Sequence, residues 1–192
     1  MTSDAITIAI KVIFLTFEIA VFAGFVIAAH RHFKQAGKGV GTGLIYANSV
    51  LLMGATFYST LLQTVVPIRC AVAVAISSAG ALLFRWAVIT TRDRGLYLAC
   101  SGRVPNGLVS SGPYKYVRHP FYLSYIIFWI GTCLVADSLV AYVLLFMLSG
   151  LYLKAASDEE KMIRQSERRV EYEEYAARTS FMLPSPFRRI ES

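Results

Sequence analysis

The segment from Phe121 to Lys154 determines how many apolar helices the sequence predicts, and it reads FYLSYIIFWIGTCLVADSLVAYVLLFMLSGLYLK. It is apolar throughout except at Asp137 and Ser138. One helix needs about 20 apolar residues to cross a bilayer, so these 34 residues are too many for one crossing. Divided at Asp137 and Ser138, the stretch predicts two short transmembrane helices over 121–136 and 139–154.

Three segments before this stretch are each long and apolar enough to cross a membrane: 5–29, 44–66 and 70–91. The sequence therefore predicts an all-α integral membrane protein, a single domain over 1–192 with five transmembrane helices. A polar loop over 92–119 and a polar tail over 155–192 complete it. The composition agrees, because only 16% of the residues are charged, whereas soluble domains carry about 25%.

The distribution of basic residues predicts the orientation. Five crossings place the first loop, the loop 92–119 and the tail on one side, which then holds sixteen of the nineteen lysines and arginines. Loops rich in lysine and arginine stay on the cytoplasmic side of a membrane. We therefore expect the N-terminus on the outer side and the tail on the cytoplasmic side. The basic excess thus reflects topology, and no nucleic-acid partner is expected. Cys70, Cys100 and Cys133 lack the spacing of metal ligands, so no metal is expected either.

A few polar or small residues inside the apolar segments need an explanation. Lys11 and Glu18 are seven residues apart and share one helical face, and we interpret them as a structural pair. Ala71, Ala75 and Ala79 form a ridge of small side chains, which predicts close packing of another helix there.

The end of the loop gathers the groups that could do chemistry. Pro120 fits the first turn of a helix, which places Arg118 and His119 at the helix start, where free N–H groups favour an anion. Tyr122 lies on the next turn, close to the same spot. From the residues alone, a ligand site and a juxtamembrane anchor of aromatic and basic residues explain this cluster equally well.

The tail offers a second cluster. Ser157 and Glu160 have the spacing of a capping box, which predicts that a helix begins there. Glu160 could instead accept hydrogen bonds from the hydroxyl or amino groups of a ligand. Residues 162–178 are typical of a weakly amphipathic helix, too charged to enter lipid, so we expect it to lie over the cytoplasmic mouth of the bundle.

Two motifs in this order resemble a known family. The run NGLVSSGPY over 106–114, followed by RHPFY over 118–122, resembles the cofactor motif of the isoprenylcysteine carboxyl methyltransferase family, which includes phospholipid N-methyltransferases. In the tail, Glu160, Tyr172, Tyr175, Arg178 with Thr179, and Pro184 follow the acidic pair, the tyrosines and the closing proline of that family. The resemblance spans 106–184, about two fifths of the chain.

The resemblance implies an integral membrane enzyme, active on the cytoplasmic face, that moves a methyl group from S-adenosylmethionine to a lipophilic small molecule or lipidated acceptor and leaves S-adenosylhomocysteine. The loop and the tail helix would cover the cofactor pocket. Arg118 and Arg178 match arginines that lie nearer the acceptor. The implied cofactor contacts are Asn106, Gly107, Leu108, Val109, Tyr114, His119, Pro120, Phe121, Tyr122 and Glu160. Glu159 replaces Glu160 in this set if the alignment of the tail with the family motif is shifted by one residue.

The acceptor stays open at this point. The arginine that prenylcysteine enzymes carry before the acidic pair falls on Ala156. A prenylcysteine carboxylate, a phospholipid amine, a small thiol and another lipophilic acid therefore remain as alternatives. A non-enzymatic rival, a small transporter or accessory subunit, would be expected to show charges lining a path through the membrane. Only Lys11, Glu18 and Arg85 lie within the apolar segments.

Overall fold

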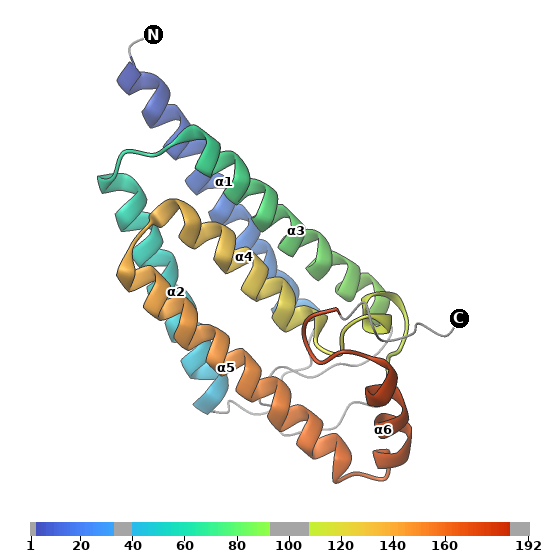
Figure 1. Ribbon diagram of the computed structural model, residues 1–192. Coiled ribbons are helices and arrows are strands. Elements are labelled where there is room, and N and C mark those ends of the chain that lie inside the picture. Colours follow the sequence, from blue (N-terminus) through green and yellow to red (C-terminus); the bar gives the residue numbers. More distant parts are fainter. Residues whose placement is uncertain (1–2, 33–39, 93–107, 185–192) are drawn as a thin grey trace.

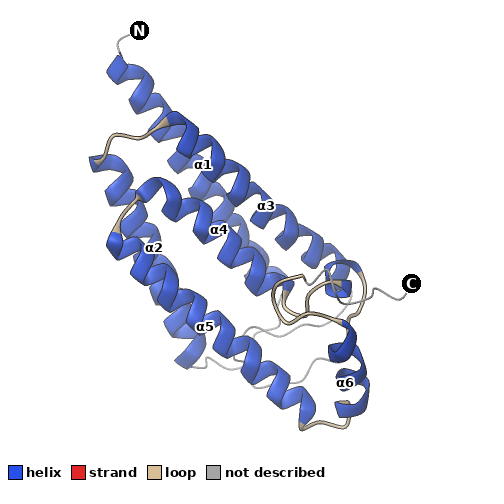
Figure 2. Ribbon diagram, viewed as in Figure 1, coloured by secondary structure: helices blue, strands red, loops and turns tan. Residues whose placement is uncertain are grey.

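The computed structural model describes residues 3–32, 40–92 and 108–184. Over these ranges the chain is helical, with one isolated bridge between Val117 and Ser180 (Figures 1 and 2). The helices are α1 (Ser3–His32), α2 (Val40–Leu62), α3 (Pro67–Thr91), the short 3-10 helix η1 (Gly112–Lys115), α4 (Pro120–Ala136), α5 (Leu139–Arg164) and α6 (Arg169–Arg178). The predicted all-α class is thereby confirmed for the described residues.

Four of these helices, α1, α2, α3 and α5, are long and apolar enough to cross a membrane. Helix α4 is apolar but has only 17 residues. At 1.5 Å per residue it is about 26 Å long, slightly less than the roughly 30 Å of a bilayer's hydrocarbon core. The fifth crossing stays a prediction that rests on α4, as does the orientation.

Helix α3 packs along α4, and two glycines make this approach possible (Figure 1). A Cβ atom on Gly80 of α3 would lie 2.7 Å from the backbone oxygen of Ser124 in α4. A Cβ on Gly131 of α4 would lie 2.8 Å from the backbone oxygen of Ala73 in α3. Small residues let two helix backbones come this close in a membrane. The two glycines therefore set the position of α4, at whose start the RHPFY motif lies.

The predicted packing ridge on α3 is wrong. Ala71, Ala75 and Ala79 are exposed, while Ser77 and Gly80 face α4. Small residues recur on both faces of this helix, and the face that also carries glycine allows the closer approach. Spacing alone did not distinguish the two faces.

The core lies where α1, α3 and α4 meet, and it is largely aromatic. Phe25 of α1 lies 4.6 Å from Phe84 of α3 and 5.2 Å from Phe128 of α4, measured between ring centroids. Phe128 is fully buried, as is Trp129 beside it. Such ring contacts bury large areas and fix how the three helices pack against one another.

The predicted pair of Lys11 and Glu18 does not form. Seven residues separate them by about 10 Å along the helix axis, which is too far for direct contact. Lys11 instead donates from Nζ to the carbonyl oxygen of Leu61, at 2.9 Å, near the end of α2. Glu18 is buried between helices, where its Oε2 lies 2.7 Å from the hydroxyl of Thr132 in α4.

The contact between Glu18 and Thr132 ties α1 to α4, and we expect it to contribute to stability. Replacing Glu18 by Ala should lower the free energy of unfolding by about 1 kcal/mol, the usual size of an interhelical hydrogen bond in a membrane. Glu18→Gln keeps the shape and a hydrogen-bonding group, so it should cost less. Thermal unfolding in detergent measures both variants. Equal melting temperatures for the Glu18→Ala and Glu18→Gln variants would contradict a stabilising role of the hydrogen bond between Glu18 and Thr132.

The tail also differs from the prediction. Helix α5 runs without a break to Arg164, so Ser157 and Glu160 lie inside it and do not form a capping box. No glycine or proline lies between Leu151 and Arg164, and the i,i+4 ion pair between Lys154 and Asp158 supports the helix there. The predicted single helix over 162–178 is also wrong, since the chain turns after Arg164 and α6 begins only at Arg169. This turn folds α6 back toward the segment that precedes α4 (Figure 1).

Candidate functional site

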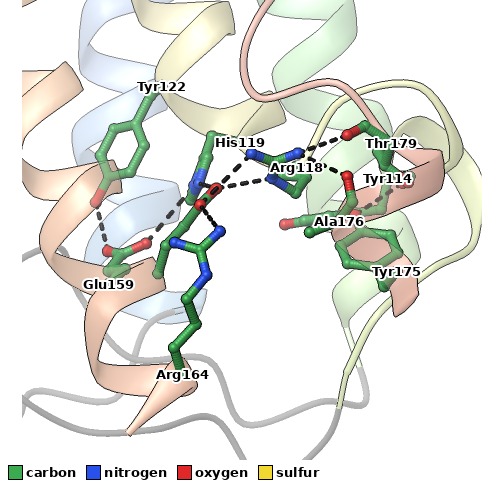
Figure 3. A network of polar contacts seen from close by, with 10 residues as sticks. Tyr114, Arg118, His119, Tyr122, Glu159, Arg164, Tyr175, Ala176 and Thr179 are labelled. Carbon is green, nitrogen blue, oxygen red and sulfur yellow. Dashed lines mark hydrogen bonds and ion pairs between the residues drawn. The ribbon is translucent and has the colours of Figure 1, made fainter. Parts of the chain in front are cut away.

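The two motifs predicted from the sequence meet at one end of the bundle, where α4 begins and α5 ends (Figure 3). The segment before α4 pairs with the segment after α6. The backbone N–H of Arg118 donates to the carbonyl oxygen of Ser180 at 2.8 Å, and the N–H of Ser180 donates to that of Tyr116 at 3.3 Å. This pairing fixes the tail across the helix start.

Arg118 joins three parts of the structure. Its Nε donates to Oε1 of Glu160 in α5 at 2.7 Å. Its Nη1 donates to the carbonyl oxygens of Thr179 at 2.6 Å and Ala176 at 3.2 Å, which end α6. The guanidinium also lies over the ring of Phe181, 5.5 Å from its centroid. A cation that satisfies the last carbonyls of a helix stabilises that end, so Arg118 anchors α6 to the bundle.

Glu160 is the centre of the polar network, and only 4% of the residue is exposed. Besides Arg118, its Oε1 lies 3.1 Å from Nε2 of His119. Its Oε2 lies 3.0 Å from Nη2 of Arg164, one turn later on α5, and 3.5 Å from Nη2 of Arg118. Two guanidinium groups thus compensate one buried carboxylate, and both of its oxygens are occupied by partners within the chain.

Glu159, the neighbouring carboxylate, has fewer partners and more contact with solvent. The hydroxyl of Tyr122 donates to its Oε1 at 2.5 Å. Its Oε2 lies 3.8 Å from Nδ1 of His119, which is an ion-pair distance but too long for a hydrogen bond. The side chain is 31% exposed. Of the two adjacent acids, Glu159 therefore has the greater capacity to accept further hydrogen bonds.

Three tyrosines surround this network from the loop and from α6. The hydroxyl of Tyr175 donates to the backbone oxygen of Tyr114 at 2.8 Å, which joins α6 to η1. Burial raises the pKa of Tyr114, of Tyr172 and of Tyr175. All three phenols are therefore neutral at physiological pH and do not act as bases.

Aromatic rings line the site on its inner side. The ring of Phe181 lies edge-on to His119 at 5.1 Å between centroids. Tyr122 lies 5.7 Å from Tyr152 of α5, which stacks on Tyr125 at 5.5 Å. The site is thus polar at the end of the bundle and aromatic toward its interior, which suits a ligand with a charged part and a flat or apolar part.

The structure brings together most of the residues that the family motif indicates. Tyr114, Arg118, His119, Tyr122, Glu159 and Glu160 share contacts as described. Pro120 and Phe121 form the buried start of α4. Leu108 and Val109 precede η1, with Val109 buried, while Asn106 and Gly107 lie outside the described residues. Arg178 is exposed and donates from Nε to the backbone oxygen of Glu174 in its own helix, apart from this network.

Sequence reasoning missed Arg164, Phe181 and Tyr152. Arg164 follows Glu160 by four residues, so the helical i,i+4 rule would have found it once α5 was extended through the acidic pair. Phe181 and Tyr152 carry no signal in the sequence, since apolar aromatic residues are frequent throughout the chain. Within the described ranges, no group of three or more His, Cys, Asp or Glu residues is arranged to hold a metal ion.

Comparison with known proteins gives one family. The family model described as phospholipid methyltransferase matches residues 68–166, which is 99 of the 192 residues. No curated protein matches the chain. The matched region runs from the start of α3 past the end of α5, so it includes Arg118, His119, Glu159 and Glu160 and excludes α6.

Proposed function

Because the chain belongs to the phospholipid methyltransferase family, we propose that it moves a methyl group from S-adenosylmethionine to a lipophilic acceptor at the cytoplasmic face of a membrane. The resemblance to the isoprenylcysteine carboxyl methyltransferase family is confirmed by this match, since that family includes the phospholipid enzymes. The family and the four long apolar helices together make the chain a membrane methyltransferase. The family gives no support to the non-enzymatic alternative.

The observation that supports the cofactor is the pairing of a partly exposed acid with aromatic rings. S-adenosylmethionine carries an ammonium group, ribose hydroxyls, a sulfonium and a flat base. Glu159 has lone pairs to accept from an ammonium or a hydroxyl, and His119 and Tyr122 lie beside it. The rings of Tyr122 and Tyr152 suit the sulfonium and the base. The residues present therefore fit this donor.

The chemistry requires little acid or base assistance from the protein. Bound S-adenosylmethionine would supply a methyl group on a sulfonium, whose displacement leaves a neutral thioether. The protein's part is to hold donor and acceptor in line and to exclude water. The ring of Phe181 packs edge-on against His119 and covers that side of the imidazole.

Of the possible acceptors, an amine of a phospholipid head group has the better support. A carboxylate such as that of isoprenylcysteine needs a cation to orient it, and Arg118 was the buried candidate. Its Nη1 already donates to two carbonyl oxygens and its Nε to Glu160. An amine needs a group to take its proton, for which His119 and Glu159 are available. Labelled methyl transfer into extracts of membrane lipids and of lipidated peptides distinguishes the two acceptors.

Ligand binding should be visible as stabilisation of the purified protein. At a concentration one hundred times its dissociation constant, S-adenosylhomocysteine should add about 2.7 kcal/mol to the free energy of unfolding. Glu159→Ala and His119→Ala should weaken its binding, measured by calorimetry in detergent. Asp158→Ala is the matched control, because Asp158 is exposed on the same helix and pairs with the exposed Lys154 one turn earlier. Unchanged affinity in both site variants would refute the assignment.

A further inference from the structure

We propose that Glu160 is a positioning residue that fixes His119 with its proton on Nε2, so that Nδ1 is the nitrogen that meets the ligand. The identity of the ligand rests on the proposed function, whereas the position of the proton rests only on contacts within the chain. The two adjacent acids thus have different roles. Glu160 orients the imidazole of His119, and Glu159 faces the ligand.

The first step concerns the charge of Glu160. Its Oε1 lies 2.7 Å from Nε of Arg118 and its Oε2 lies 3.0 Å from Nη2 of Arg164. Arginine remains protonated in proteins and can only donate hydrogen bonds. A carboxyl group between two such cations is held in its ionised form, and an ionised carboxylate has lone pairs but no proton to give.

The second step concerns the ring of His119. Its Nε2 lies 3.1 Å from Oε1 of Glu160, with both side chains more than nine-tenths buried. If Nε2 carried a lone pair, two acceptors would face each other without water between them, which is unfavourable in a buried site. The contact is a hydrogen bond only when Nε2 donates. Neutral His119 therefore carries its proton on Nε2 and a lone pair on Nδ1.

The third step concerns the other edge of the ring. Nδ1 lies 3.8 Å from Oε2 of Glu159, so in the neutral imidazole two acceptors face a common space. A group with at least two N–H or O–H donors, such as an ammonium or a pair of hydroxyls, satisfies both at once. Phe181 against the ring and the hydrogen bond to Glu160 prevent the imidazole from turning away. With an amine acceptor, Nδ1 is then the atom that takes the proton released as the N–C bond forms.

The tautomer is measurable by nitrogen NMR without any assay of activity. The chain has three histidines, and replacing His30 and His32 by Asn leaves only His119 to observe. The full chain, labelled with 15N-histidine in nanodiscs, is titrated to the pH at which the imidazole is neutral. We expect the Nε2–H form with a hydrogen-bonded, slowly exchanging proton. A dominant Nδ1–H form would overturn the proposal.

Glu160→Gln tests the part played by Glu160. An amide can donate as well as accept, so the restriction to Nε2–H should be lost and a population of the Nδ1–H form should appear. Asp158→Asn on the same helix is the control and should leave the spectrum unchanged, because Asp158 pairs with Lys154. A Glu160→Gln spectrum identical to that of the wild type would overturn the positioning role.

Titration with S-adenosylhomocysteine separates this proposal from the proposed function. Binding beside Nδ1 should shift the Nδ1 resonance while the Nε2 proton stays in place. If the apo protein shows the expected tautomer and the Nδ1 resonance does not respond, the assignment of Glu160 stands and the proposed cofactor site fails. If the resonance responds but the tautomer is Nδ1–H, the cofactor site stands and the role of Glu160 fails.

Discussion

Replacement of Arg118 by Ala is expected to abolish methyl transfer and to lower the free energy of unfolding by about 3 to 5 kcal/mol, the usual cost of breaking a buried ion pair. The loss has two sources. Glu160 loses the partner at 2.7 Å from its Oε1, and the carbonyl oxygens of Ala176 and Thr179 at the end of α6 lose their donor. Methyl-transfer assays and unfolding in detergent measure both effects.

Arg118→Lys should fail to restore either property. The guanidinium reaches a carboxylate on one side and two carbonyl oxygens on the other through different nitrogens, whereas an ammonium is a single point donor. Arg169→Ala is the matched control, because Arg169 forms an exposed i,i+4 pair with Glu173 that is worth about 0.3 to 0.5 kcal/mol. A Lys variant with wild-type stability and activity would contradict the anchoring role of Arg118.

A double-mutant cycle tests whether Arg118 acts through Glu160. Each single Ala variant leaves a charged partner buried, so the two single losses together should exceed the loss in the double variant. The remaining loss in the double variant then includes the contacts of Arg118 with the end of α6 and those of Glu160 with Arg164 and His119. Strict additivity would show that the two residues stabilise the site independently.

The sequence predicted the elements of the site better than their connections. Hydropathy located the apolar helices within about four residues, except that α5 extends ten residues beyond the predicted end at 154. The family motif indicated His119, Tyr122 and Glu160, with Glu159 as the alternative. The sequence did not reveal that Arg118 binds the end of α6, because the acceptors are backbone oxygens, which have no signature in a sequence. It also placed a helix start at Ser157, since capping rules describe the ends of helices and do not show where an end lies.

The same limit applies to packing inside the bundle. Helical periodicity shows which residues share a face but not which face meets a neighbour. Ala71 and Ala79 satisfied the small-residue pattern and are exposed, whereas Gly80 carries the contact with α4. The pairing of Lys11 with Glu18 failed for a similar reason, because a shared face does not imply contact across two turns. Which face of a helix meets a neighbour depends on how several helices pack together.

Replacing Gly80 by Val is expected to destabilise the bundle by about 3 kcal/mol or more, at the upper end of the cost of overpacking. The atoms that a Cβ would meet are the backbone oxygen of Ser124 at 2.7 Å and the backbone nitrogen of Phe128 at 2.9 Å. A flexible side chain could turn aside, but backbone atoms inside a helix cannot, so α3 and α4 must separate. The melting temperature in detergent measures the effect.

Separation of α3 from α4 should also disturb the candidate functional site, because α4 begins immediately after His119 and the imidazole of His119 contacts Glu160 on α5. Gly80→Ala and Gly131→Ala should therefore weaken S-adenosylhomocysteine binding although neither glycine lies near the polar network. Gly54→Ala and Gly150→Ala are matched controls, since nothing lies within 4 Å of a Cβ at either position. There alanine should be neutral or slightly stabilising through its higher helix propensity. Full binding by the Gly80 and Gly131 variants despite lower melting temperatures would show that the site is held by α5 and α6 alone.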